Sequence, residues 1–262
     1  MSLISKNFFL NRSKMLTFLG ELEETPDSGA VSFYFLPGLA ESEIKDMVKN
    51  INIQSLSDEL TGMVAASKNG AILFSGEERN YLVLPPFPVR EKAVFSGYTG
   101  EPLRRLLESD FRIGLILLHL GTYAIGICQG EKLISSKVGT GLVHGRHKKG
   151  GSSQQRFQRR RQNQISEFLD RVCLHTREQL EPHSKELDYI IYGGPKQTVM
   201  QMQKRCPFLQ SLGDRVLPLV DVPSLRQKVL DATVTRVWSS CIIEWQSDDF
   251  YPQADSMLES DP

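Results

Sequence analysis

Hydrophobic and polar positions follow two different rhythms along the chain. In the first hundred residues, short apolar runs between glycines and prolines are typical of strands, at 30–36, 70–76, 81–84 and 92–98. Apolar residues at helical spacing predict short helices at about 10–22, 42–51, 56–66 and 101–108. This mixture predicts a small α+β domain over residues 1–109.

The pattern after residue 110 is more regular. Apolar runs predict strands at 113–118, 122–128, 132–138, 188–192, 216–220 and 237–245. Helices are expected at 153–180, 195–205 and 223–234. Alternation of strands and helices predicts a layered α/β domain with a mixed sheet over 110–246, so the fold class is α/β. The polar, acidic residues 247–262 are expected to form a loose tail.

The expected helix at 153–180 carries one apolar stripe. Its members recur at helical spacing and predict a face packed on the core: Phe157, Arg161, Ile165, Phe168, Leu169, Val172 and Thr176. Arg161 is the exception in this stripe, and we expect its aliphatic stem to cover the core.

The composition of the chain mainly argues against certain partners and targeting segments. The chain has 262 residues, of which 31 are basic and 31 acidic, so we expect neither DNA nor a membrane as a partner. Apolar runs are too short to cross a bilayer, and the N-terminal residues lack the pattern of a signal peptide. The four cysteines are far apart and form no CxxC pair, which fits a reducing cytoplasm.

Charge is distributed unevenly despite the neutral total. No acidic residue lies between Lys132 and Ser166, whereas this interval holds nine cations. A solvated charged face is one interpretation. However, the run is interrupted by Gly150-Gly151 and passes the amides of Gln154 and Gln155 at the start of the expected helix. Glycine allows close approach to a ligand, and cations hold phosphates. A glutamine amide can orient water and stabilise an oxyanion, although it cannot act as a general base.

Residues 145–161, GRHKKGGSSQQRFQRRR, resemble the GGQ loop and following helix of archaeal and eukaryotic class I peptide-chain release factors. The resemblance extends over about residues 30–240. It implies a catalytic tip that enters the peptidyl-transferase centre and promotes hydrolysis of peptidyl-tRNA. The implied catalytic residues are Gly150, Gly151, Ser153, Gln154 and Gln155. Contacts with large-subunit rRNA and tRNA are implied for Arg146, His147, Lys148, Lys149, Arg156, Arg159 and Arg160.

Two departures refine the expected function. Ser152 stands where the strict motif has glutamine, and 151–154 instead resemble the GxxQ loop of the Vms-type (ANKZF-type) branch. Residues 41–66 are too short for the long helical hairpin that reads stop codons. The resemblance therefore implies a codon-independent, cytoplasmic release factor that rescues stalled ribosomes or split large subunits.

Several alternatives stay open at this point. Ser152 and Gln155 match a capping box, which would make Gln155 structural, and Gln154 and Gln155 compete for the active role. His144 and His147 lack acidic or thiol neighbours, so we expect no metal and no cofactor. A ribosome or tRNA adaptor without catalysis is one rival function. A ribonuclease acting near the tRNA 3′ end is another.

Overall fold

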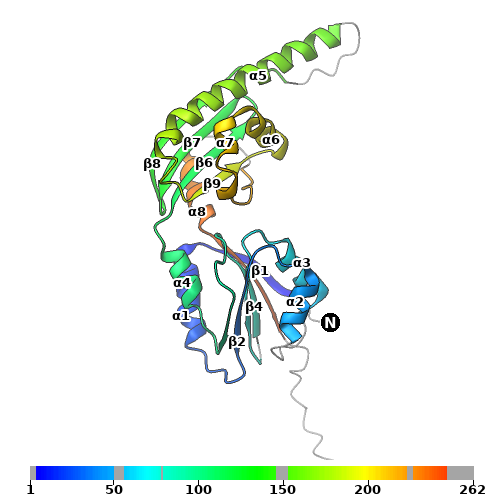
Figure 1. Ribbon diagram of the computed structural model, residues 1–262, viewed down its shortest axis with the longest axis vertical. Coiled ribbons are helices and arrows are strands. Elements are labelled where there is room, and N and C mark those ends of the chain that lie inside the picture. Colours follow the sequence, from blue (N-terminus) through cyan, green and yellow to red (C-terminus); the bar gives the residue numbers. More distant parts are fainter. Residues whose placement is uncertain (1–3, 50–55, 78, 146–152, 223–226, 247–262) are drawn as a thin grey trace, which may run out of the picture. The chain divides into compact units, whose positions relative to one another are not determined.

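The chain forms two compact units in the computed structural model, which describes residues 4–49, 56–77, 79–145, 153–222 and 227–246 (Figure 1). The first unit combines residues 1–108 with the residues from 239 onward. The second unit comprises residues 109–238. The chain therefore leaves the first unit after Glu108 and returns to it at Ser239. The expected tail, 247–262, lies outside the described residues.

A six-stranded antiparallel sheet organises the first unit, in the order β1-β10-β4-β3-β2-β5. Its strands are β1 (Ile4–Leu10), β2 (Val31–Phe35), β3 (Ala71–Ser75), β4 (Arg79–Leu84), β5 (Ala93–Ser96) and β10 (Ser240–Gln246). Successive side chains of a strand point to opposite faces, so β2 sends Tyr34 to one core and Phe33 and Phe35 to another. Both faces of the sheet are consequently apolar.

Four helices cover these two faces. Leucines of α1 (Arg12–Glu23) and α4 (Glu101–Glu108) pack with Tyr34 on one side. On the other side, α2 (Glu41–Lys49) and α3 (Asp58–Ala66) pack with Phe33 and Phe35. The side-chain oxygens of Asn11 and Ser57 accept hydrogen bonds from Lys14 N and Leu60 N, which caps α1 and α3.

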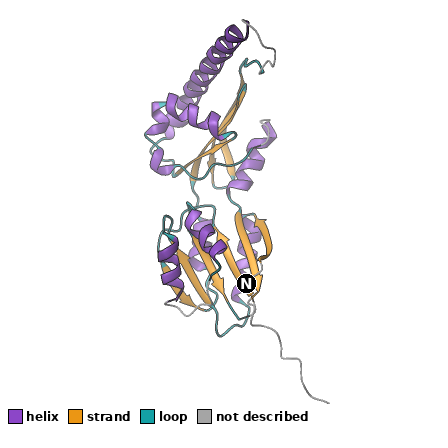
Figure 2. Ribbon diagram, turned by 90° about the vertical axis from the view of Figure 1, so that its right-hand side faces the viewer, coloured by secondary structure: helices purple, strands orange, loops and turns teal. Residues whose placement is uncertain are grey.

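The second unit contains a four-stranded mixed sheet in the order β8-β7-β6-β9 (Figure 2). Strands β6 (Arg112–His119), β7 (Thr122–Gln129) and β8 (Lys132–Thr140) form an antiparallel meander, and β9 (Tyr189–Gly193) pairs parallel to β6. Turns at Gly121 and Gly130, both with positive φ, connect the meander. The predicted mixed α/β fold class is confirmed.

Helices lie on both faces of this sheet. Ile125 and Ile127 of β7 share a core with the long helix α5 (Ser153–Leu180), with α6 (Lys196–Arg205) and with the short α7 (Pro207–Gln210). Gly126, between these two residues, faces the opposite side of the sheet, where Leu230 of α8 (Gln227–Val237) lies. Short 3-10 turns at Glu181–His183 and Gly213–Arg215 complete the unit. The unit ends at Trp238, whose indole Nε1 donates to the Gly130 carbonyl oxygen at 3.1 Å.

Three sequence predictions about strands were wrong or incomplete. The strand expected at 237–245, assigned to domain 110–246, is β10, which lies between β1 and β4 in the first unit. Periodicity identifies a strand but not its partners. No strand was expected at β1, whose sequence ISKNFFL lacks clear alternation. Segment 216–220 forms only isolated bridges to β9, at Val216 and Val220, because Pro218 between them has no N–H.

A disulfide joins Cys173 of α5 to Cys206 at the end of α6. This pair was not expected, because the two cysteines are 33 positions apart in the sequence and spacing alone does not indicate a bond between them. Cys128 is buried with its pKa raised to about 12 by desolvation, and Cys241 is also free. The disulfide therefore anchors the C-terminal half of α5 to the helix packed beside it.

Loss of this disulfide is expected to lower the free energy of unfolding of the second unit by about 3 to 4 kcal/mol, because it closes a loop of 33 residues. We would measure urea unfolding by Trp238 fluorescence in a Trp245→Phe background, with and without reductant. The Cys173→Ser, Cys206→Ser variant is the control, and reductant should not affect it. An identical midpoint for the reduced and oxidised parent chains would contradict the expectation.

Candidate nucleic-acid interface at the start of the long helix

Helix α5 packs on the core of its unit from Ile165 onward. Its 28 residues extend for about 42 Å, and Ile165 is the first buried side chain along it. Side chains 154–160 are all exposed, and Figure 1 shows this end of α5 extending past the strands of its own unit. The core stripe expected to start at Phe157 therefore starts two turns later. Phe157 is 51% exposed, because no strand lies beneath that part of the helix.

The predicted site residues fall into two groups. Gly150, Gly151, Arg146, His147, Lys148 and Lys149 lie outside the described residues, and so does Ser152 of the proposed capping box. Ser153 is the first residue of α5. Gln154, Gln155, Arg156, Arg159 and Arg160 follow in the first turns, all with exposed side chains. The structure thus gathers the described members at one helix end.

Arg156, Arg159 and Arg160 form a cationic face. Their spacing of three and four residues places them on the same side of α5. Like charges at this spacing repel each other, and the first turn of α5 holds no acidic residue. Cations at a helix N-terminus also oppose the helix dipole. Within the described part of the chain, none of these three guanidinium groups has an ion-pair partner, so the face is suited to an external anion.

Charged side chains farther along α5 have partners instead. Arg177 Nε donates to Glu181 Oε2 at 2.9 Å, and Arg205 of α6 makes a two-pronged ion pair with Asp170 at 2.7 and 3.0 Å. A hydrogen bond from Arg205 holds the pKa of the Asp170 carboxyl below its usual range. Lys137 of β8, and after it His175, likewise lower the pKa of Glu178. Unpaired cations are therefore a feature of the projecting end, not of the whole helix.

The segment that follows β8 runs along the core-facing side of α5 toward the N-terminal end of the helix. The backbone N–H of His144 donates to Gln164 Oε1 at 3.2 Å, and Arg161 Nε donates to the His144 carbonyl oxygen at 2.9 Å. Arg161 was expected to cover the core with its stem, and a role for Gln164 was missed. Contacts with main-chain atoms leave no sequence motif. However, Arg161 and Gln164 precede Phe168 by seven and four residues, and this spacing indicates that all three share one helix face.

No metal site accompanies these groups. Across the described ranges, no three His, Cys, Asp or Glu side chains are placed so that they could hold a metal ion. None of the described helices combines the length and apolarity needed to span a bilayer.

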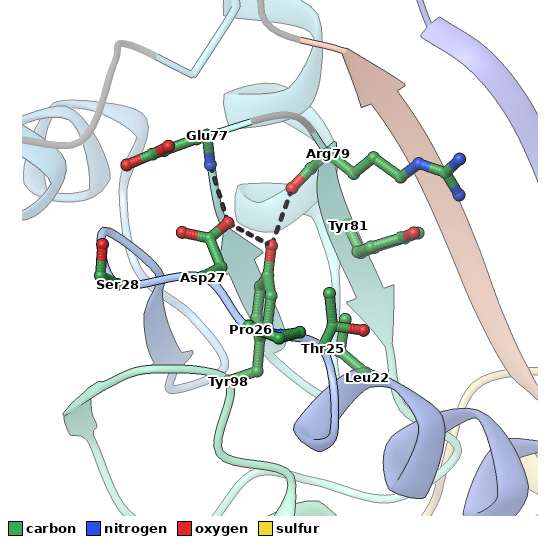
Figure 3. Close-up of a pocket in the computed structure, with 9 residues that line it drawn as sticks. All are labelled: Leu22, Thr25, Pro26, Asp27, Ser28, Glu77, Arg79, Tyr81 and Tyr98. Atoms are coloured by element: carbon green, nitrogen blue, oxygen red, sulfur yellow. Dashed lines mark hydrogen bonds between the residues drawn. The ribbon is translucent and has the colours of Figure 1, made fainter.

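A pocket of about 610 Å³ lies in the first unit and contains none of the predicted site residues (Figure 3). Its central carboxylate, Asp27, accepts hydrogen bonds from the Glu77 backbone N–H at 3.0 Å and from the Tyr98 hydroxyl at 3.2 Å. The backbone N–H of Gly29 occupies the other oxygen at 3.1 Å. Asp27 therefore holds three chain segments together and is not a free base.

Comparisons with known proteins point to translation factors. The family model acVLRF1, described as the Actinobacteria/chloroflexi VLRF1 release factor, matches residues 111–242, just over half of the chain. Peptide chain release factor subunit 1 of Archaeoglobus fulgidus is 31% identical over 165 residues, which cover 62% of this chain and 40% of that protein. The same factor of Aeropyrum pernix is 25% identical over 225 residues, with 73% and 60% covered.

The chain spans less than two thirds of the length of these two relatives. Among solved structures, the archaeal translation termination factor aRF1 is 20% identical, and the match covers 87% of this chain and 73% of the aRF1 chain. Its TM-score is 0.36, so it adds nothing to the sequence comparison.

Proposed function

Because the chain belongs to the acVLRF1 family of release factors, we propose that it frees nascent peptides by hydrolysing the ester bond of peptidyl-tRNA on the ribosome. Its site of action is then the cytoplasm. Water attacks the ester carbonyl carbon, the bond to the tRNA 3′-terminal ribose breaks, and the products are a peptide carboxylic acid and a tRNA hydroxyl. The residues proposed to act on this ester are Gln154, Gln155, Gly150, Gly151 and Ser153.

The observation that carries this proposal is the projecting end of α5. There, three arginines that have no ion-pair partner among the described residues lie beside two exposed glutamines. RNA offers a dense array of phosphates that would relieve the repulsion among Arg156, Arg159 and Arg160. A helix end whose described side chains 154–160 are all exposed can enter a narrow RNA-lined space without losing core contacts. We therefore assign the cationic face to large-subunit rRNA and tRNA phosphate, together with Arg146, His147, Lys148 and Lys149.

Glutamine at such a tip acts by orientation and polarity. Its amide can donate to a developing oxyanion and accept from the attacking water, and such preorganised donors are worth most where bulk water is excluded. The side chains of Gln154 and Gln155 are exposed, and neither makes a hydrogen bond to another described residue. Gly150 and Gly151 would allow the main chain to approach the tRNA terminus closely. Holding water and ester together accounts for much of the expected acceleration.

The short helices of the first unit support action that does not depend on a codon. Its helices α2 and α3 have nine residues each, or about 14 Å. Helices of this length do not form the long hairpin with which codon-reading release factors reach the message. Rescue of stalled ribosomes or split large subunits is therefore the function that fits this chain best.

The test is product analysis on stalled ribosome–nascent-chain complexes and on large subunits that carry labelled peptidyl-tRNA. Free peptide together with full-length tRNA is the expected result. Binding without release would instead identify an adaptor, and a shortened tRNA would identify a ribonuclease. Either of these outcomes contradicts the proposed hydrolysis.

A further inference from the structure

The chain that leaves β8 is seated on α5 before it reaches the basic loop. A Cβ on Gly141 would lie 2.6 Å from Cδ2 of Phe168, so only glycine permits this close approach of the segment to the helix. Val143, two residues later, packs against the core that α5 shares with the sheet. The segment therefore follows the helix surface toward its N-terminal end.

At His144 the contact changes from apolar to polar. Gln164 accepts from the His144 backbone N–H, and Arg161 donates to the His144 carbonyl oxygen. Both side chains are three residues apart on α5 and thus share one face. We name this arrangement, the side chains of Arg161 and Gln164 on the main chain of His144, the His144 clasp. It satisfies both backbone polar groups of a residue that has no strand neighbour.

The clasp continues a stripe on α5 that holds the same segment. Positions 161, 164, 168 and 171 alternate in steps of three and four, which keeps them on one side of a helix. Arg171 is the most C-terminal of these positions, and its Nη1 lies 3.4 Å from the Thr140 carbonyl oxygen. Side chains of α5 therefore contact the segment from Thr140 to His144 in order, and the clasp is the last of these contacts before the basic loop.

Gln154 lies on the same side of the helix as the clasp. It precedes Arg161 by seven residues, which is close to two full turns, or about 10 Å along the axis. One rigid helix thus carries both Gln154 and the groups that fix the start of the loop at His144. Arg156 and Arg159 lie away from Gln154 and Arg161 around the helix, whereas Arg160 precedes Gln164 by four residues and lies beside it.

We infer that Arg161 and Gln164 are positioning residues of the release reaction. They fix His144, near the end of the described segment that follows β8, on the same helix that carries Gln154. This inference rests on the proposed function for its reaction, whereas the clasp itself is a property of the free protein. It also makes Gln154, rather than Gln155, the glutamine that shares a helix face with the Arg161 side of the clasp.

The test compares Arg161→Met, Gln164→Met with the control Gln162→Met, which makes the same kind of change on the exposed side. We expect the double variant to lower kcat for peptide release about 10- to 100-fold with KM for ribosomes unchanged, because misplacement affects the reacting geometry. Gln164→Glu keeps an acceptor for the His144 N–H and should stay near wild type. A purely electrostatic role of Arg161 would instead raise KM and be restored fully by Arg161→Lys.

A second measurement does not depend on release. Trypsin should cut the free double variant after Arg146, Lys148 or Lys149 faster than the wild type or Gln162→Met. Wild-type kcat in the double variant would overturn the positioning role, and unchanged cleavage would overturn the clasp as a tether. If the wild type frees no peptide, the proposed function fails and the positioning role with it, while cleavage still decides whether the clasp holds the segment.

Discussion

Replacing Gln154 and Gln155 together by alanine is expected to slow peptide release about 100- to 1000-fold. This is the loss seen when a single preorganised donor is removed from an oxyanion site. Ribosome affinity should stay near wild type, because the cationic face is untouched. The measurement is single-turnover release at saturating protein, which separates chemistry from binding. Of the single variants, Gln154→Ala should account for most of the loss, since Gln154 shares its helix face with the His144 clasp.

Gln158→Ala is the matched control for this experiment. Gln158 is also exposed and lies one turn farther along α5. It should release peptide at the wild-type rate. Full activity in the Gln154→Ala, Gln155→Ala variant would remove both amides from the mechanism.

Removing the cationic face by Arg156→Ala, Arg159→Ala and Arg160→Ala is expected to weaken ribosome binding without a comparable loss of kcat. Each arginine that neutralises one phosphate contributes about one unit to the slope of log affinity against log salt. The slope should therefore fall by roughly three for the triple variant and by about one for each single variant. Binding measured between low and physiological salt gives this slope directly.

Arg177 provides the control for the salt dependence. Its guanidinium group is paired with Glu181, so Arg177→Ala should leave the slope unchanged although it removes the same charge. If Arg177→Ala and Arg160→Ala lowered the slope equally, general charge rather than the projecting face would govern binding.

Much of this fold could be predicted from residue patterns. The apolar stripe of α5 predicted its packed face correctly from Ile165 onward, and the three strands that form the meander were expected. The comparisons confirm the resemblance of the chain to release factors. These features are local, so spacing and turn chemistry are enough to identify them.

Long-range pairing could not be predicted in the same way. The sequence of β10 indicates a strand. Its place between β1 and β4 depends on pairing with strands that are far away in the sequence, 150 residues or more in the case of β4. The Cys173–Cys206 bond and the His144 clasp are of the same kind. Each depends on elements that the fold brings together, and the clasp uses main-chain groups, which every residue has.

The most direct measurement of the central claim is peptide release from purified large subunits in water enriched in oxygen-18. If the tip of α5 directs water onto the ester, the released peptide gains one oxygen-18 atom in its C-terminal carboxyl group, and the tRNA keeps its complete 3′ end. Peptide that remains esterified to a nucleotide, or the absence of release by the wild-type chain, would contradict the account.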